Sequence, residues 1–136
     1  MSGTSLVIGS TGLIGKKLIF ELAKKDSEVI AITRRSISNL PENVTLLEIN
    51  FDDFLDNGSL PSCDHIYICL GTTIKKAGSQ SEFKKVDFDY SVSFARKARE
   101  AGATKISLVS SVGANPYSKN FYLKTKGEVE EEIKKI

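Results

Sequence analysis

Three glycines between an apolar run and an amphipathic run have a spacing that could hold a phosphate. Gly9, Gly12 and Gly15 follow the apolar segment Leu6–Ile8 at intervals of three residues. At a strand-to-helix junction the first glycine allows a tight turn, the second lets the backbone approach a pyrophosphate, and the third lets the helix pack closely. The spacing differs from the usual G-x-G-x-x-G pattern, and a plain glycine-rich loop is the alternative. We nevertheless predict a dinucleotide-binding turn at the positive end of a helix. It is formed by Gly9, Ser10, Thr11, Gly12, Leu13, Ile14 and Gly15.

Two arginines end the next apolar run of the chain. Arg34 and Arg35 follow Val29–Thr33, where an acidic residue would bond the ribose 2′-hydroxyl of NAD and an arginine accommodates the 2′-phosphate of NADP. We therefore predict NADP(H) as the cofactor, with NAD less favoured; two solvated surface arginines are the alternative. Asp52, after a third apolar run, is a candidate contact of the adenine, and equally a candidate for the capped start of a helix.

Residues able to transfer a proton lie near the end of the chain. Tyr122 and Lys126 are four residues apart, so they share one face of a helix. A lysine cation stabilises a phenolate, which makes a neighbouring tyrosine a usable acid or base near neutral pH. A serine of the pair Ser110-Ser111 can hold a substrate carbonyl while the tyrosine transfers the proton. The tyrosine–lysine spacing alone is common in helices, so a purely structural role is the alternative.

The elements that must position these residues alternate along the whole chain. We predict strands over Leu6–Ile8, Glu28–Thr33, Val44–Ile49, His65–Leu70 and Lys105–Ser110. We predict helices over Leu13–Lys25, Glu82–Ala101 and Tyr117–Ile136, with a single helical turn over Asp52–Asn57. Such alternation predicts an α/β fold of Rossmann type. Its doubly wound parallel sheet would have strand order 3-2-1-4-5 between two layers of helices, with the ligand crevice where the order reverses.

Length and composition limit the other classes of function. The 136 residues predict one domain over residues 1–136, and a net charge of +2 is too small to indicate nucleic acid as a partner. We find no signal peptide and no apolar stretch long enough to span a membrane. Cys63 and Cys69 do not form a C-x-x-C pair, and the single histidine, His65, argues against a multi-histidine metal site. These features predict a reduced, cytoplasmic protein with no metal.

Five stretches, in chain order, resemble the short-chain dehydrogenase/reductase superfamily and, within it, an atypical branch similar to the Tat-interacting protein. They are Gly9–Gly15 (GSTGLIG), Cys69–Thr73 (CLGTT), Val86–Tyr90 (VDFDY), Leu108–Ala114 (LVSSVGA) and Phe121–Glu130 (FYLKTKGEVE). The resemblance implies hydride transfer between a nicotinamide and a carbonyl or alcohol substrate. It implies cofactor contacts from the glycine turn and Arg34, and catalytic roles for Tyr122 and Lys126. Ser111 is implied as the catalytic serine more than Ser110, because Val-Gly follows it. The residues implied near the nicotinamide are Leu70, Gly71, Thr72 and Thr73.

The sequence departs from this superfamily in two places. Asp87 stands where many members carry an asparagine that orders a proton-relay water, so that relay is not implied here. The chain also ends with the helix of Tyr122, where members continue into segments that shape a substrate pocket. We therefore expect a C-terminally truncated, cofactor-binding core. Two functions follow: an NADP-dependent oxidoreductase, or a non-catalytic NADP(H)-binding module for redox sensing or protein interaction.

The last predicted strand, Lys105–Ser110, would be an unpaired edge of the sheet. Apolar edge strands invite pairing with another chain. We therefore expect self-association, as a homodimer, through this strand or through helix packing at which Gly127 allows a close approach. Close packing of Gly127 on its own sheet is the alternative.

Overall fold

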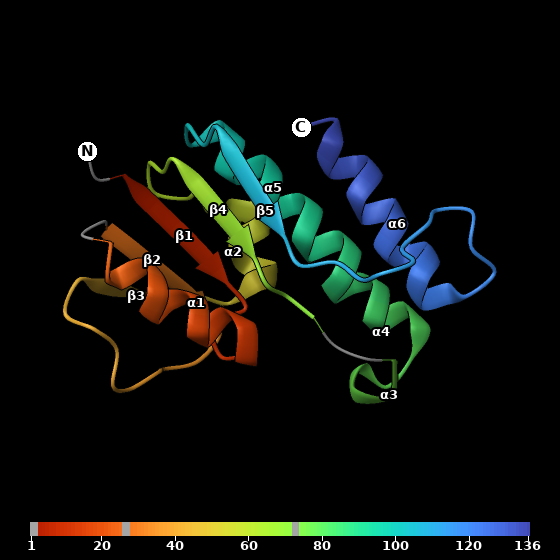
Figure 1. The fold of residues 1–136 in the computed structure, drawn as a ribbon, viewed down its shortest axis with the longest axis horizontal. Coiled ribbons are helices and arrows are strands. Elements are labelled where there is room, and N and C mark those ends of the chain that lie inside the picture. Colours follow the sequence, from red (N-terminus) through yellow and green to blue (C-terminus); the bar gives the residue numbers. More distant parts are fainter. Residues whose placement is uncertain (1–2, 26–27, 72–73) are drawn as a thin grey trace.

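Five parallel strands form the centre of the fold in the computed structural model, which describes residues 3–25, 28–71 and 74–136 (Figure 1). The strands are β1 (Thr4–Ile8), β2 (Glu28–Thr33), β3 (Val44–Glu48), β4 (His65–Ile68) and β5 (Lys105–Leu108). Their order in the sheet is β3-β2-β1-β4-β5, and every neighbouring pair is parallel. The predicted Rossmann-type order is thereby confirmed. It reverses between β1 and β4, where doubly wound sheets bind their ligands.

Helices cover both faces of this sheet, which explains the continuous apolar run of β1. The helices are α1 (Leu13–Ala23), α2 (Phe51–Asn57), α3 (Ile74–Ala77), α4 (Gln80–Lys84), α5 (Ser91–Glu100) and α6 (Phe121–Lys134). Leu6 and Ile8 of β1 belong to the larger hydrophobic core with residues of α2 and α5, while Val7 packs with residues of α1 on the other face. All three side chains are fully buried. A strand that is buried on both faces has no polar alternation in its sequence.

The helix predicted over Glu82–Ala101 begins earlier and is not regular. It consists of α4, a π-helical stretch η1 (Lys85–Tyr90) and α5. Ser79 caps its start by accepting a hydrogen bond from the Glu82 amide at 3.1 Å. The short helix α3, just before it, was not predicted, because four residues are too few to show a helical period. π-helical turns are rare and occur frequently at functional sites.

The last helix begins at Phe121 rather than at Tyr117. The Asn120 side chain caps α6 by accepting a hydrogen bond from the Leu123 amide at 3.0 Å. Gly127, in the middle of this helix, is buried, and a Cβ atom there would collide with the backbone of Asn115 and Pro116. The close approach that Gly127 allows is therefore to the preceding loop of its own chain. The predicted role of Gly127 in an interchain helix contact is wrong.

Candidate functional site

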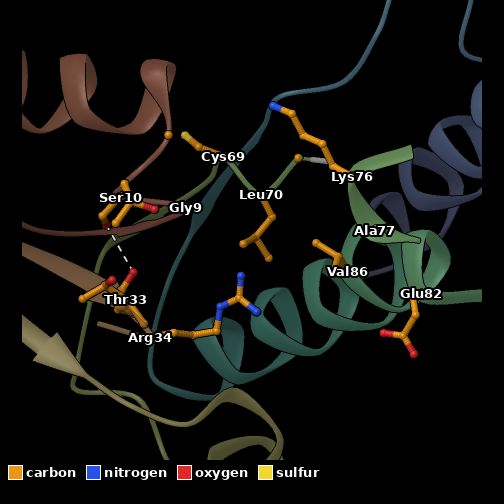
Figure 2. A pocket seen from close by; sticks show the side chains of 14 residues that line it. Gly9, Ser10, Thr33, Arg34, Cys69, Leu70, Lys76, Ala77, Glu82 and Val86 are labelled. Atoms are coloured by element: carbon orange, nitrogen blue, oxygen red, sulfur yellow. Dashed lines mark hydrogen bonds between the residues drawn. The ribbon is translucent and has the colours of Figure 1, made fainter. Parts of the chain in front are cut away.

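A cavity of about 350 Å³ opens at the carboxyl ends of β1, β2 and β4 (Figure 2). One wall is the turn after β1, the floor is the end of β2, and the far wall is formed by α3, α4 and η1. The lining residues are Gly9, Ser10, Thr11, Gly12, Ile32, Thr33, Arg34, Cys69, Leu70, Gly71, Lys76, Ala77, Glu82 and Val86. The cavity lies where the strand order reverses, which is the ligand site that the topology predicts.

The three glycines of the turn differ in what a Cβ atom would meet at each position. Gly9 has φ 88°, and a Cβ atom on it would lie 2.5 Å from the Cys69 carbonyl oxygen. A Cβ atom on Gly15 would collide with the carbonyl oxygen of Gly9, so the start of α1 rests directly on the turn. At Gly12, in contrast, a Cβ atom would approach only the Gly9 carbonyl oxygen, at 3.4 Å. The fold itself requires Gly9 and Gly15, whereas at Gly12 the space is open on the side of the cavity.

The other residues of the turn contribute mainly through their backbone. Ser10 lines the cavity, but its side chain is buried, with Oγ 2.9 Å from the Val7 carbonyl oxygen and 3.2 Å from that of Ile32 (Figure 2). This hydroxyl ties the turn to β1 and β2. Leu13 and Ile14 stand outside the cavity lining and are 74% and 53% exposed. Among the residues that the structure describes, no side chain caps α1, so the amide groups of Leu13 and Ile14 at its start are the part suited to an anion.

The two arginines after β2 are separated by the structure. The Arg34 side chain lines the cavity, points toward Leu70 and places its guanidinium carbon 5.4 Å from the centroid of the Phe51 ring (Figure 2). Arg35 does not line it; its amide donates to the Thr33 hydroxyl at 3.2 Å, and its side chain is exposed. Of the predicted pair, Arg34 alone stands beside the glycine turn.

Asp52 lies outside the cavity lining, in the first turn of α2. Its carboxylate accepts hydrogen bonds from the Tyr90 hydroxyl at 3.0 Å and from Lys85 Nζ at 3.3 Å. These two bonds hold the pKa of Asp52 below its usual value. The structure thus places Asp52 in a link between α2 and η1. The cap of α2 is Asn50, whose side chain accepts a hydrogen bond from the Asp53 amide at 3.1 Å.

The far wall supplies residues that sequence reasoning missed. Lys76 of α3 extends over the end of the cavity opposite Arg34, and Glu82 of α4 lines the same wall (Figure 2). The basic pair Lys75-Lys76, shortly after a predicted strand, was the available signal. Leu70 and Gly71 line the cavity as expected, while Thr72 and Thr73 lie outside the described residues.

Cys69 is the one thiol in the cavity lining as the structure describes it. Burial raises the pKa of this thiol, so it stays protonated and weakly nucleophilic at neutral pH. Within the described ranges no three His, Cys, Asp or Glu side chains gather as a metal site would require. In those same ranges none of the helices combines the length and the apolarity that crossing a bilayer demands.

Tyr122 and Lys126 do not line the cavity but contact its helical wall. The Tyr122 ring packs on Phe83, with centroids 5.3 Å apart, and Phe83 is the neighbour of the cavity residue Glu82. Lys126 Nζ lies 5.5 Å from the centroid of the Tyr122 ring. The wall formed by α4 and η1 therefore contacts both the cavity and the tyrosine–lysine pair.

The two candidate serines differ in their partners. The Ser110 hydroxyl donates to Glu130 Oε2 on α6 at 3.1 Å. The Ser111 hydroxyl instead donates to the adjacent carbonyl oxygen of Val112 at 3.3 Å, an exposed bond that a ligand could replace. Neither serine lines the cavity, and the choice of Ser111 over Ser110 stays a prediction.

Named proteins similar to this chain are longer than it. Protein FMP52, mitochondrial, of Lodderomyces elongisporus is 37% identical over 145 residues, which cover 98% of this chain and 61% of the relative. Protein HTATIP2 of Rattus norvegicus is 33% identical over 136 residues, which cover 96% of this chain and 56% of the relative. The chain thus spans about three fifths of the length of these relatives.

Two solved structures share the fold. MoeE5 in complex with UDP-glucose and NAD superposes with a TM-score of 0.77 at 17% identity, covering 96% of this chain and 48% of that one. Human epimerase family protein SDR39U1 (isoform 2) with NADPH gives a TM-score of 0.71 at 20% identity, with 96% and 48% covered. At these identities the likeness concerns the fold, and it confirms the Rossmann-type architecture.

The cytoplasmic location predicted from the sequence is contradicted by the relatives. Those of Lodderomyces elongisporus, Candida albicans and Debaryomyces hansenii are all named mitochondrial. The prediction failed because unpaired cysteines and ordinary composition are compatible with any reducing compartment.

A family model described as the NAD dependent epimerase/dehydratase family matches residues 5–132, from β1 into α6. The match covers both the glycine turn and the helix of Tyr122, and with the HTATIP2 relative it confirms the expected resemblance to the short-chain dehydrogenase/reductase type. The chain belongs to the NAD dependent epimerase/dehydratase family.

Proposed function

We propose that the cavity binds NADP(H). The observation that carries this proposal is that Arg34 and the glycine turn line one cavity at the reversal point of the sheet. A dinucleotide phosphate needs a backbone without a side chain, free amide groups and a nearby cation. Gly12 offers the open cradle, the uncapped start of α1 offers the amides, and Arg34 offers the cation.

The lining residues suggest how the cofactor lies. Arg34, at the end of β2, would take the 2′-phosphate of the adenosine ribose, because a guanidinium pairs with phosphate through two parallel hydrogen bonds. The turn around Gly12 would take the pyrophosphate. Leu70 and Gly71, after β4, would lie beside the nicotinamide, where Lys76 adds a second positive charge. Family membership is compatible with NAD as well as NADP, so the preference for NADP rests on Arg34.

For the reaction we propose an oxidoreductase acting on a carbonyl or alcohol. The bound cofactor supplies or accepts the hydride. Tyr122 gives the proton to the substrate oxygen or removes it, Lys126 stabilises the phenolate, and Ser111 holds the substrate oxygen. Lys126 Nζ stands close enough to the Tyr122 ring, at 5.5 Å from its centroid, for its charge to act on the phenol.

A non-catalytic NADP(H)-binding module is the second candidate function. It is favoured by the position of Ser111, Tyr122 and Lys126 outside the cavity lining. Turnover of NADPH with small aldehydes and ketones separates the two candidates, because a sensor or interaction module binds the cofactor without oxidising it.

Replacing Arg34 by alanine tests the proposed cofactor. We expect the unmodified chain to bind NADPH more tightly than NADH, and Arg34→Ala to erase that preference. One charge-assisted contact is worth about 1.5–3 kcal/mol, or roughly tenfold to a hundredfold in Kd. Isothermal titration calorimetry with NADPH and with NADH measures the two Kd values of each variant.

Arg35→Ala is the matched control, since Arg35 is adjacent and lies outside the cavity lining. It should keep the preference for NADPH. Equal affinity of the unmodified chain for NADPH and NADH would refute the proposed cofactor preference.

We further propose that the chain forms a homodimer. β5 is an edge strand, and beside it lies a groove of about 540 Å³. Its lining combines the apolar Ile106, Ile133 and Ile136 with polar and charged residues. Unpaired edges next to apolar surface favour association. Sedimentation equilibrium at micromolar concentration should give twice the mass of the chain; a stable monomer would rule the dimer out.

A further inference from the structure

Asp87 and Lys126 form an ion pair in the interior of the protein. Lys126 Nζ lies 3.2 Å from Asp87 Oδ2, and the two side chains are 8% and 1% exposed. Removing two charges from water costs more than their attraction usually returns, so a buried pair is poor evidence of a contribution to stability. Such a pair therefore calls for another explanation.

The pair is incompletely satisfied. Among the described residues neither carboxylate oxygen of Asp87 has a well-aligned hydrogen-bond partner, and the same holds for the buried hydroxyl of Thr125, next to Lys126. Burial raises the pKa of Asp87, and the Lys126 ammonium opposes that rise. An ammonium group has three N–H donors, so the contact with Asp87 leaves donors for a second partner.

The fold places this pair next to a wall of the cavity. Asp87 lies in the π-helical stretch η1, and its neighbour Val86 lines the cavity. Lys126 lies one turn after Tyr122 on α6, with Nζ 5.5 Å from the centroid of its ring. The ammonium group thus contacts Asp87 of η1 and stands near the Tyr122 ring.

We propose that Asp87 is a positioning residue, which holds the Lys126 ammonium toward the nicotinamide half of the cofactor and toward Tyr122. The inference rests on the proposed function, because it requires NADP(H) in the cavity. Asp87 itself touches neither cofactor nor substrate and acts only through Lys126. Its carboxylate compensates the lysine charge in the interior and fixes the direction of the side chain.

The test compares NADPH with 2′,5′-ADP, which carries the adenosine half of the cofactor and lacks the nicotinamide. In Asp87→Asn, which keeps the shape and removes the charge, we expect Kd for NADPH to rise about tenfold and Kd for 2′,5′-ADP to stay unchanged. General loosening of the fold would instead raise Kd for both ligands by the same factor. Asp89→Asn is the matched control, since Asp89 lies in the same π-helical stretch and is exposed.

A double-mutant cycle shows whether Asp87 acts through Lys126. In a Lys126→Met background, Asp87→Asn should have no further effect on Kd for NADPH. An equal effect of Asp87→Asn in both backgrounds would overturn the proposal. So would an unchanged Kd in Asp87→Asn while the unmodified chain binds NADPH. If the unmodified chain binds neither ligand, the proposed function itself fails, and this inference fails with it.

A labelling experiment on the unmodified chain covers the case in which Asp87→Asn does not fold. Acetic anhydride modifies accessible lysine amines, and peptide mass spectrometry reports each site. Lys126 should react more slowly than the exposed Lys124 on the same helix. NADPH should slow the reaction of Lys126 further, whereas 2′,5′-ADP should not. If NADPH leaves Lys126 labelling unchanged, Lys126 does not face the cofactor and the proposal is wrong.

Discussion

Replacement of Gly12 by valine is expected to abolish NADPH binding while the chain stays folded. The backbone of Gly12, at φ −76° and ψ 167°, is open to any residue, and a Cβ atom there approaches only the Gly9 carbonyl oxygen, at 3.4 Å. The added side chain would occupy the part of the cavity assigned to the pyrophosphate. Loss of two or more charge-assisted contacts, at about 1.5–3 kcal/mol each, weakens binding by at least about a hundredfold.

On the same preparation, calorimetry measures the affinity for NADPH and circular dichroism measures whether the chain is folded. Gly15→Ala is the informative comparison, because its Cβ atom would collide with the Gly9 carbonyl oxygen inside the protein. It should lower the melting temperature, whereas Gly12→Val should not. A folded Gly12→Val variant with normal affinity for NADPH would show that the glycine turn is not the cofactor site.

Tyr122→Phe is expected to remove turnover and to leave NADPH binding intact. Phenylalanine keeps the ring contact with Phe83 and the position over the Lys126 ammonium, so the packing of α6 is preserved. It removes the only proton that Tyr122 could transfer. A general acid or base contributes about 10²–10⁴-fold to the rate, and kcat should fall by that factor.

The decay of NADPH absorbance in the presence of a small aldehyde or ketone reports the rate. Tyr117→Phe is the matched control, since this tyrosine is 91% exposed and lies in the loop just before α6. It should turn over like the unmodified chain. Unchanged turnover in Tyr122→Phe would assign Tyr122 a structural role, and a chain that binds NADPH but shows no turnover at all would favour the non-catalytic module.

The sequence predicts those parts of the site whose geometry depends on residues nearby in the chain or on the order of the strands. Gly15 rests on the Gly9 carbonyl oxygen and Gly9 has a positive φ, so both answer conditions within one strand–turn–helix unit, which their spacing shows. The close approach of Gly9 to Cys69, after β4, does not follow from that spacing. Arg34 follows from the topology, because the carboxyl ends of parallel strands meet at one edge of the sheet. The strand order is predictable for the same reason, as each right-handed crossover leaves few arrangements.

The parts that sequence could not predict depend on contacts between distant segments. Asp87 was visible as a departure from the family pattern, but its partner Lys126 lies far along the chain. The π-helical turn that contains Asp87 interrupts a helix whose apolar pattern looks regular. Lys76 comes from a four-residue helix, and Gly127 packs against a loop, so neither position follows from a periodic pattern.

The two walls of the cavity differ in how extensively they pack against the rest of the protein. The glycine turn continues directly from β1, whose Leu6, Val7 and Ile8 are fully buried. The opposite wall includes α3, which packs mainly on α4 and is followed by Gly78, with φ 96° and open space around it. A dinucleotide would thus meet one wall already in its bound geometry, while the entropic cost of fixing side chains falls on the other. If the cavity binds NADP(H) as proposed, preorganisation would set the affinity for its phosphates, and the order that binding must impose would set the affinity for its nicotinamide end.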